Sequence, residues 1–173
     1  MRYSKVVETL LVINEFELTQ EQIAELPVVL KARAVLVTPD GDLVMTHNKD
    51  GTDYFTHGLP GGCVEEGEAL DHAVMRECLE ETGYRIEIVA EMGIMDDIRK
   101  NRVSRTYLWL ARTVGQQEPL ALTQEEIDIF HECKIMPFLD GCAQIETEYA
   151  EYGGHTLLRS VTAVRKAKEL RGL

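Results

Sequence analysis

The sequence predicts an α+β fold, in which helices pack on a central β-sheet. Several β-branched and aromatic runs, bounded by glycine, proline and aspartate, are typical of strands. Two other segments repeat apolar residues every three or four positions, as amphipathic helices do. The 173 residues, of which 45% are apolar and 28% charged, suffice for one well-filled core.

The first 29 residues predict an extension packed on a main domain of residues 30–173. Residues 5–13 are apolar and β-branched, and their periodicity fits either a strand or a short buried helix. Thr19 and Gln22 have the spacing of a capping box, which predicts a short helix that ends at Pro27.

A β-hairpin is predicted next, from the strand of residues 28–37 to the strand of residues 43–47. Pro39 to Asp42 form the turn, because proline and Asp-Gly favour turn dihedral angles. Residues 58–62 contain three glycines and a proline, which predicts irregular backbone that turns sharply or approaches another segment closely.

A helix is predicted for residues 69–82, with Leu70, Val74 and Cys78 on its apolar side and Gly83 as its stop. The runs 84–95 and 103–114 predict an antiparallel pair of strands. We expect the polar stretch from Asp96 to Arg102 to connect them.

The last third of the chain predicts shorter elements and a terminal helix. Residues 118–130 contain a loop and then the start of a strand or a helix, and KIMPFL from Lys134 predicts a short strand. Residues 156–170 predict a helix, whose basic side is expected to be solvated. That side consists of Arg159, Arg165, Lys166 and Lys168.

Composition excludes several classes of protein. The formal net charge of −12 disfavours generic coating of DNA or RNA. The four cysteines form no CxxC pair, which argues against a zinc knuckle or a disulfide scaffold. No apolar run approaches 18 residues, and no signal-peptide pattern opens the chain, so we expect a cytoplasmic protein without a membrane anchor.

Three carboxylates mark the segment with the strongest chemical signal. On a helix, Glu77, Glu80 and Glu81 stand at i, i+3 and i+4, and therefore on one face within a single turn. Like charges this close repel each other, so the arrangement is best explained by divalent cations between the oxygens. Mg²⁺ and Mn²⁺ prefer such oxygens and complete their coordination with phosphate. An acidic helix face is otherwise more often a solvated surface.

The spacing around these carboxylates resembles the signature of the Nudix hydrolase family. That signature is Gly, five residues, Glu, seven residues, Arg-Glu, an aliphatic residue, any residue, Glu-Glu, any residue, Gly and an aliphatic residue. The matching positions are Gly62, Glu68, Arg76, Glu77, Glu80, Glu81 and Gly83. Cys78 and Tyr84 stand where the family usually has Ile, Leu or Val. The resemblance implies an α/β/α sandwich around a central mixed β-sheet.

The resemblance also implies roles for these residues. The implied catalytic set is Glu77, Arg76 and Glu80. The implied Mg²⁺ or Mn²⁺ ligands are Glu77, Glu80, Glu81 and the carbonyl of Gly61, with Glu77 either a ligand or the general base. Arg76 would orient a glutamate, and Glu68 would form an ion pair with Arg76 about two turns along the helix.

Further candidates surround this segment. Gly62 and Glu68 are candidate supporting residues, and Glu126 or Glu125 is a candidate for one more carboxylate from a loop. His57 lies two positions before Leu59 and is the most plausible substrate-pocket residue among the histidines, which are otherwise more often surface or structural side chains.

Cys78 lies on an apolar stripe and is expected to be a buried structural thiol. Trp109 is expected to pack in the core.

The resemblance predicts metal-dependent hydrolysis of a phosphoanhydride bond, by water attack on phosphorus, in a nucleoside diphosphate linked to another moiety. A Nudix-fold sensor that binds nucleotides without turnover is the alternative, although a sensor needs no repulsive carboxylate cluster. An isoprenoid diphosphate isomerase is a third possibility, but its cysteine and metal arrangement has no counterpart here.

The substrate stays open within this prediction. Family members specific for ADP-ribose or diadenosine polyphosphates carry a proline or a tyrosine about sixteen residues past the signature, where this chain has Arg99-Lys100-Asn101-Arg102. Neither marker is present, which weakens both subgroups without excluding them, and nucleoside triphosphates, sugar nucleotides and oxidised nucleotides stay open as well. The expected partner is a small nucleotide-like diphosphate; the oligomeric state stays open, and a homodimer would be unsurprising for the family.

Overall fold

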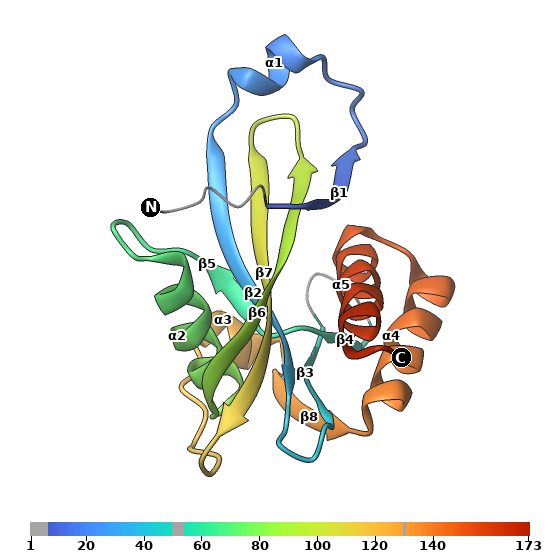
Figure 1. The fold of residues 1–173 in the computed structure, drawn as a ribbon. Helices are drawn as coiled ribbons and strands as arrows, with labels where there is room; N and C mark the ends of the chain where they lie inside the picture. The colour runs from blue at the N-terminus through green and yellow to red at the C-terminus, as the bar shows by residue number, and fades with distance from the viewer. Residues whose placement is uncertain (1–6, 50–53, 130) are drawn as a thin grey trace, which may run out of the picture.

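The computed structural model describes residues 7–49, 54–129 and 131–173, and it has three layers (Figure 1). A twisted sheet forms the middle layer, α2 (Leu70–Thr82) covers one face, and α4 (Phe138–Tyr152) and α5 (His155–Arg171) cover the other. Two short helices, α1 (Gln20–Ala24) and α3 (Gln124–Asp128), lie outside these layers. The strands are β1 (Thr9–Asn14), β2 (Val28–Val37), β3 (Leu43–Asn48), β4 (Thr56–Gly58), β5 (Gly61–Cys63), β6 (Arg85–Ile98), β7 (Val103–Val114) and β8 (Glu132–Met136).

The sheet is mixed, as predicted. Its strand order is β1-β6-β7-β2-β3-β4, while β5 also pairs with β2 and β8 with β3. The pairs β1–β6 and β2–β7 are parallel, and the others are antiparallel. The predicted hairpins β2–β3 and β6–β7 are both present. None of the helices in the described ranges is long and apolar enough to cross a membrane.

The N-terminal segment resolves one alternative left open by the sequence. Residues 9–14 form a strand, β1, which lies along the edge of the sheet beside β6; residues 5 and 6 of the predicted element lie outside the described residues. The capping box of α1 is confirmed, because Gln22 N donates to Thr19 Oγ1 and Thr19 N donates to Gln22 Oε1. The division of the chain at residue 29 stays a prediction.

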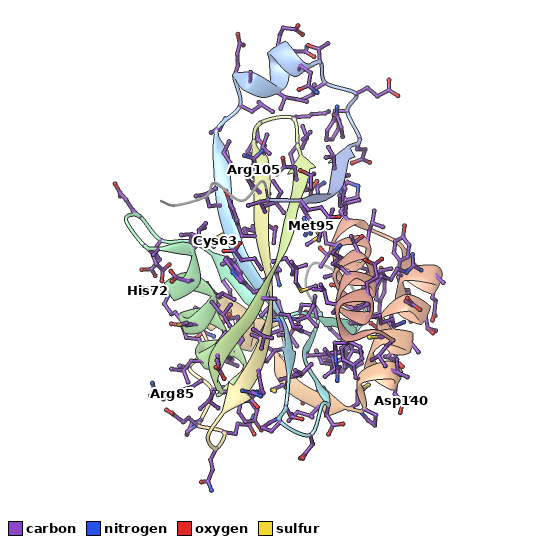
Figure 2. All side chains as sticks on the ribbon, in the orientation of Figure 1. Cys63, His72, Arg85, Met95, Arg105 and Asp140 are labelled. Atoms are coloured by element: carbon purple, nitrogen blue, oxygen red, sulfur yellow. The ribbon has the colours of Figure 1, made fainter. Side chains whose placement is uncertain are left out.

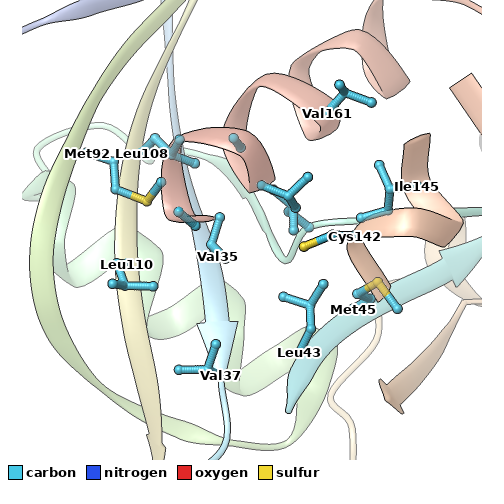
Figure 3. Packing of buried hydrophobic residues seen from close by; sticks show 14 of the residues in the cluster. Val35, Val37, Leu43, Met45, Met92, Leu108, Leu110, Cys142, Ile145 and Val161 are labelled. Atoms are coloured by element: carbon cyan, nitrogen blue, oxygen red, sulfur yellow. The ribbon is translucent and has the colours of Figure 1, made fainter. Parts of the chain in front are cut away.

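Two hydrophobic clusters hold the layers together. Because side chains alternate along a strand, β2 sends Val35 and Val37 toward α4 and α5, and sends Leu36 toward α2. Figure 3 shows the first cluster, in which these valines pack with residues of β3, β7 and the two C-terminal helices. Trp109 is buried in the second cluster, as predicted. Figure 2 shows Met95, a residue of β6, on the side of the strand toward α5.

The expected connection of residues 96–102 is wrong in its first half. Strand β6 continues to Ile98, so only residues 99–102 turn. The strand tolerates these acidic residues because each has cationic partners: Arg105 binds Asp96 through two hydrogen bonds, and Asp97 is paired with Arg99 and with Arg159 from α5. Periodicity could not show the partner from α5, which lies 62 residues away.

The expected irregular backbone of residues 58–62 is also partly wrong, since β4 ends at Gly58 and β5 begins at Gly61. The predicted close approach is confirmed. A Cβ atom at Gly61 would collide with the carbonyl oxygen of Ala32 and would lie 2.6 Å from the Cα of Arg33. The absence of a side chain therefore lets β5 lie directly beside β2.

The predicted strand KIMPFL stops at Met136, and its last residues belong to α4, a helix that the sequence analysis did not predict. Pro137 cannot donate to a strand ladder and stands at the helix N-cap. Phe138, Cys142 and Ile145 then form a buried stripe at helical spacing. Of residues 118–130, the described part contains a helix, α3, rather than a strand; Phe130 lies outside the described residues.

Candidate active site

The candidate site is built on the last turns of α2. Gly83 ends this helix in the left-handed conformation, with φ of 73°, and its N–H donates to Leu79 O. Glu77 and Glu81 of this helix contact the glycine segment of β5, and Glu80 shares Arg76 with Glu77. The predicted single-turn cluster of carboxylates is therefore present.

Arg76 connects three of the glutamates singled out by the sequence. Its Nε and Nη2 donate to the two carboxylate oxygens of Glu68, at 2.9 and 3.0 Å. Its Nη1 donates to Glu77 Oε1 at 2.9 Å and to Glu80 Oε2 at 3.0 Å. Nη2 also donates to the carbonyl of Cys63, which ties the helix to β5. One guanidinium thus fixes the orientation of two carboxylates on the candidate face.

The glycine segment contacts the same helix turn through its backbone. Gly61 N donates to Glu81 Oε2 at 2.7 Å. A Cβ atom at Gly62 would lie 2.5 Å from Glu77 Oε2, so the Glu77 carboxylate covers this glycine. These contacts explain why two consecutive glycines precede the helix: one approaches β2, and the other makes room for a carboxylate.

Burial gives the carboxylates different electrostatic properties. Burial raises the pKa of Glu77, and it raises the pKa of Glu81 to about 8, against the opposing effect of Arg33. Hydrogen bonds from Arg76 instead lower the pKa of Glu68 to about 2. Glu68 is therefore a permanent anion that holds Arg76, whereas Glu77 and Glu81 lie where a bare negative charge is disfavoured.

We expect Gly62→Ala to impair the site more than the fold. The new methyl group displaces the Glu77 carboxylate, so kcat should fall by roughly 10–100-fold, the scale of a misplaced reacting group. The free energy of unfolding should fall by less than about 1.5 kcal/mol, because the obstructing atoms belong to a side-chain end. Steady-state kinetics and urea unfolding of the same preparation test this. A loss of stability without a loss of kcat would contradict the placement of Glu77.

The donor chemistry of the cluster fits a hard divalent cation. Three carboxylates and the nearby Gly61 carbonyl supply the oxygen atoms that Mg²⁺ and Mn²⁺ prefer. In the structure the carboxylates turn toward Arg76 and the Gly61 N–H, and no three acidic, histidine or cysteine side chains within the described ranges converge on one metal position. The burial of Glu77, 9% exposed, is nevertheless the setting in which a cation compensates a carboxylate.

A cavity of about 610 Å³, called the central cavity below, opens beside this cluster. It lies between the sheet, α3 and the N-terminal part of α5, and it reaches the cluster at Glu81. Of the residues singled out by the sequence, Glu81, His57, Glu125 and Glu126 line it. The others, namely Gly61, Gly62, Glu68, Arg76, Glu77 and Glu80, lie outside its lining, around the helix turn.

His57 is held in the central cavity by a buried carboxylate. Glu148 of α4, 5% exposed, accepts hydrogen bonds from His57 N at 2.7 Å and from its Nδ1 at 2.6 Å. Burial would raise the pKa of Glu148, but hydrogen bonds from His57 and Gln144 lower it below its usual value. Glu148 was not singled out by the sequence, because α4 itself was not predicted.

The expected solvated position of Arg159 is wrong. Its side chain is 13% exposed, lines the central cavity and lies 2.6 Å from Asp97 Oδ2.

Arg33 lines the same cavity and donates to the carbonyl of Leu59. The sequence contained one signal for Arg33: with Lys31, it interrupts an otherwise apolar strand. For Arg159 no local signal distinguished it from the exposed cations of its helix. Cys78 is fully buried, as predicted.

Comparison with known proteins identifies the class. A family model described as the NUDIX domain matches residues 29–152, which is well over half of the chain. The chain therefore belongs to the Nudix hydrolase family, as its sequence motif predicted.

The similar proteins agree with this class. Over 36 residues the chain is 50% identical to a protein named "Putative 8-oxo-dGTP diphosphatase" from Bacillus subtilis (strain 168); the match spans 21% of this chain and only 24% of that protein. The solution structure of the E. coli ORF135 protein matches with a TM-score of 0.63 at 14% identity, covering 86% of this chain and 94% of the other. A NUDIX hydrolase from Nitrosomonas europaea matches with a TM-score of 0.62 at 17% identity, covering 82% and 90%. The predicted fold is confirmed.

Proposed function

We propose that the protein hydrolyses a phosphoanhydride bond in a nucleoside diphosphate linked to another moiety, with Mg²⁺ or Mn²⁺ as cofactor. The observation that carries this proposal is the single helix turn that holds three carboxylates: Arg76 binds Glu77 and Glu80, and Glu81 lines the central cavity. Membership of the Nudix hydrolase family and the name of the short Bacillus subtilis match support the same reaction type.

The metal and the residues of the helix turn would each contribute to this reaction. Bound metal would neutralise charge on the phosphates and lower the pKa of a coordinated water. Arg76 holds Glu77 and Glu80 in fixed orientations, and Glu68 in turn holds Arg76. In this proposal Glu77 would either bind metal or accept the proton of the attacking water, which then forms the new bond to phosphorus as the leaving phosphate departs.

The central cavity would hold the nucleotide part of the substrate. Its volume of about 610 Å³ lies within the usual range for small-molecule sites. Arg33 and Arg159 supply positive charge there, which a phosphate substrate requires in a chain of net charge −12. Glu125 and Glu126 stay candidates for one more carboxylate. A cytoplasmic location and a homodimeric state are further proposals.

The test is phosphate-product release from a panel of nucleoside triphosphates, oxidised nucleoside triphosphates, sugar nucleotides and ADP-ribose. Each compound is assayed with Mg²⁺, with Mn²⁺ and with EDTA. We expect hydrolysis that EDTA abolishes and that either cation restores, and the best substrate then names the substrate class. Tight nucleotide binding without turnover across the panel would instead support the alternative of a Nudix-fold sensor.

A further inference from the structure

A second cavity, called the basic cavity below, lies at the end of the β6–β7 hairpin next to the N-terminus of α5. Its volume is about 460 Å³. Five of the chain's 18 lysine and arginine residues line it, with one carboxylate, Asp97. The five are Lys31, Arg99, Lys100, Arg102 and Arg159. In a protein with a net charge of −12, this concentration of cations around one hollow marks a place for an anion.

The cations come together through elements far apart in the sequence. The backbone hydrogen bond from Arg99 N to Arg102 O closes the hairpin turn and places both arginines at its ends. Lys31 belongs to β2, and Arg159 belongs to α5. Lys100 lies over the ring of Phe16, which follows β1 and also lines the cavity. Three separate segments therefore contribute the cations, and a fourth contributes Phe16.

Asp97 offsets only part of this charge. Its Oδ2 lies 2.8 Å from Arg99 Nη2 and 2.6 Å from Arg159 Nη1, so one carboxylate is shared by two guanidinium groups. Within the described part of the chain, neither Lys31 nor Arg102 forms an ion pair. Burial, and after it the neighbouring Arg33, lowers the pKa of Lys31. The cavity therefore holds like charges that an anion would stabilise.

The basic cavity adjoins the central cavity, because Arg159 and Thr156 line both. Arg33 and Lys31 are two positions apart on β2 and so share one face of the sheet, the first beside the central cavity and the second beside the basic one. A row of cations thus leads away from the carboxylate cluster at Glu81. A molecule bound in the central cavity could reach the basic cavity with a second anionic group.

We propose that the basic cavity binds a phosphate group, carried by the substrate at a position separate from the phosphoanhydride that is cleaved. Guanidinium groups suit this ligand because their planar donors match phosphate oxygens. Buried Ser104 and exposed Thr156 and Asn101 add neutral donors to the lining. The assignment to a substrate phosphate rests on the proposed function, whereas phosphate binding itself does not.

The first arm of the test measures binding without catalysis. Isothermal titration calorimetry with inorganic phosphate is carried out in EDTA, so that no metal draws phosphate to the glutamates. We expect Lys31→Gln and Arg102→Gln each to weaken phosphate binding by at least tenfold. Arg112→Gln is the matched control, because Arg112 is an exposed arginine paired with Glu87 far from the cavity. Arg102 is exposed, so its variant should fold even if Lys31→Gln does not. Absent binding, or equal binding in all four proteins, overturns the proposal.

The second arm separates a substrate phosphate from a free one. KM is measured for pairs of compounds that differ in one phosphate: ADP-ribose and its 2′-phosphate, and ATP and its 3′-phosphate. We expect a lower KM for the phosphorylated member in the wild type and in Arg112→Gln, and a ratio near one in Arg102→Gln. Phosphate binding without this preference would overturn the substrate assignment and leave a site for free phosphate. If no compound is hydrolysed, the proposed function fails, and calorimetry still decides whether the cavity binds phosphate.

Discussion

Replacing Glu77 by glutamine should lower kcat by at least about 100-fold, the usual scale for losing a general base or a metal-binding carboxylate. The substitution keeps the size of the side chain, and its amide oxygen can still accept from Arg76 Nη1, which lies 2.9 Å from Glu77 Oε1. What it removes is the negative charge at a position that is 9% exposed. The loss should therefore affect catalysis and metal binding, while the fold persists.

The measurement is single-turnover product release with saturating Mg²⁺, together with Mg²⁺ titration followed by thermal unfolding. Glu66→Gln serves as the control, because Glu66 is an exposed glutamate of the same segment at a variable position of the motif. We expect Mg²⁺ to raise the Tm of the wild type and of Glu66→Gln, but to raise that of Glu77→Gln much less. Near-normal turnover by Glu77→Gln would refute both roles considered for this residue.

Gly61→Ala should be the most destabilising of the substitutions considered, lowering the free energy of unfolding by about 2–5 kcal/mol from backbone strain and overpacking together. Gly61 has φ of 134°, which side chains other than hydrogen rarely adopt. A methyl group there would also collide with the carbonyl of Ala32 and with Arg33 on the paired strand. Since both obstacles include backbone, β5 would have to move away from β2, and it would carry the Gly61 N–H away from Glu81.

Urea unfolding of Gly61→Ala is best compared with Gly115→Ala. Gly115 also has a positive φ, of 75°, but a Cβ atom there would meet nothing within 4 Å. The control should therefore lose only about 1 kcal/mol from strain, and the difference between the two variants measures the close approach of β5 to β2. Equal losses in the two variants would show that Gly61 is not pressed against the neighbouring strand.

The sequence was sufficient wherever the signal was local. Helix α2 could be predicted because its apolar stripe, its three glutamates and its terminal Gly83 lie within fifteen residues. The motif around it predicted the family and, through the resemblance, implied the pairing of Glu68 with Arg76, which the structure shows although Glu68 precedes the helix. The hairpins β2–β3 and β6–β7 were likewise visible as apolar runs around short turns.

Predictions from the sequence were wrong where the structure around a residue depends on a partner far away in the chain. Asp96 and Asp97 resembled a polar loop, yet they lie in a strand because Arg105 and Arg159 neutralise them. Helix α4 was missed because Pro137 sits between a strand and an apolar stretch that could extend it. Its absence from the prediction also concealed Glu148, the partner of His57.

By itself, then, the sequence determined the class of this protein, since the Nudix motif depends on fixed spacings along one strand-to-helix segment. Only the tertiary structure decided which cations serve the two cavities. No local pattern groups Arg33 and Lys31 with Arg102 and Arg159, and the four line neighbouring cavities only because β2, the β6–β7 turn and α5 come together in the fold. The physical reason is that the interaction between two charges depends on their distance in the folded protein. Sequence periodicity, by contrast, predicts only which way a side chain points from its own helix or strand.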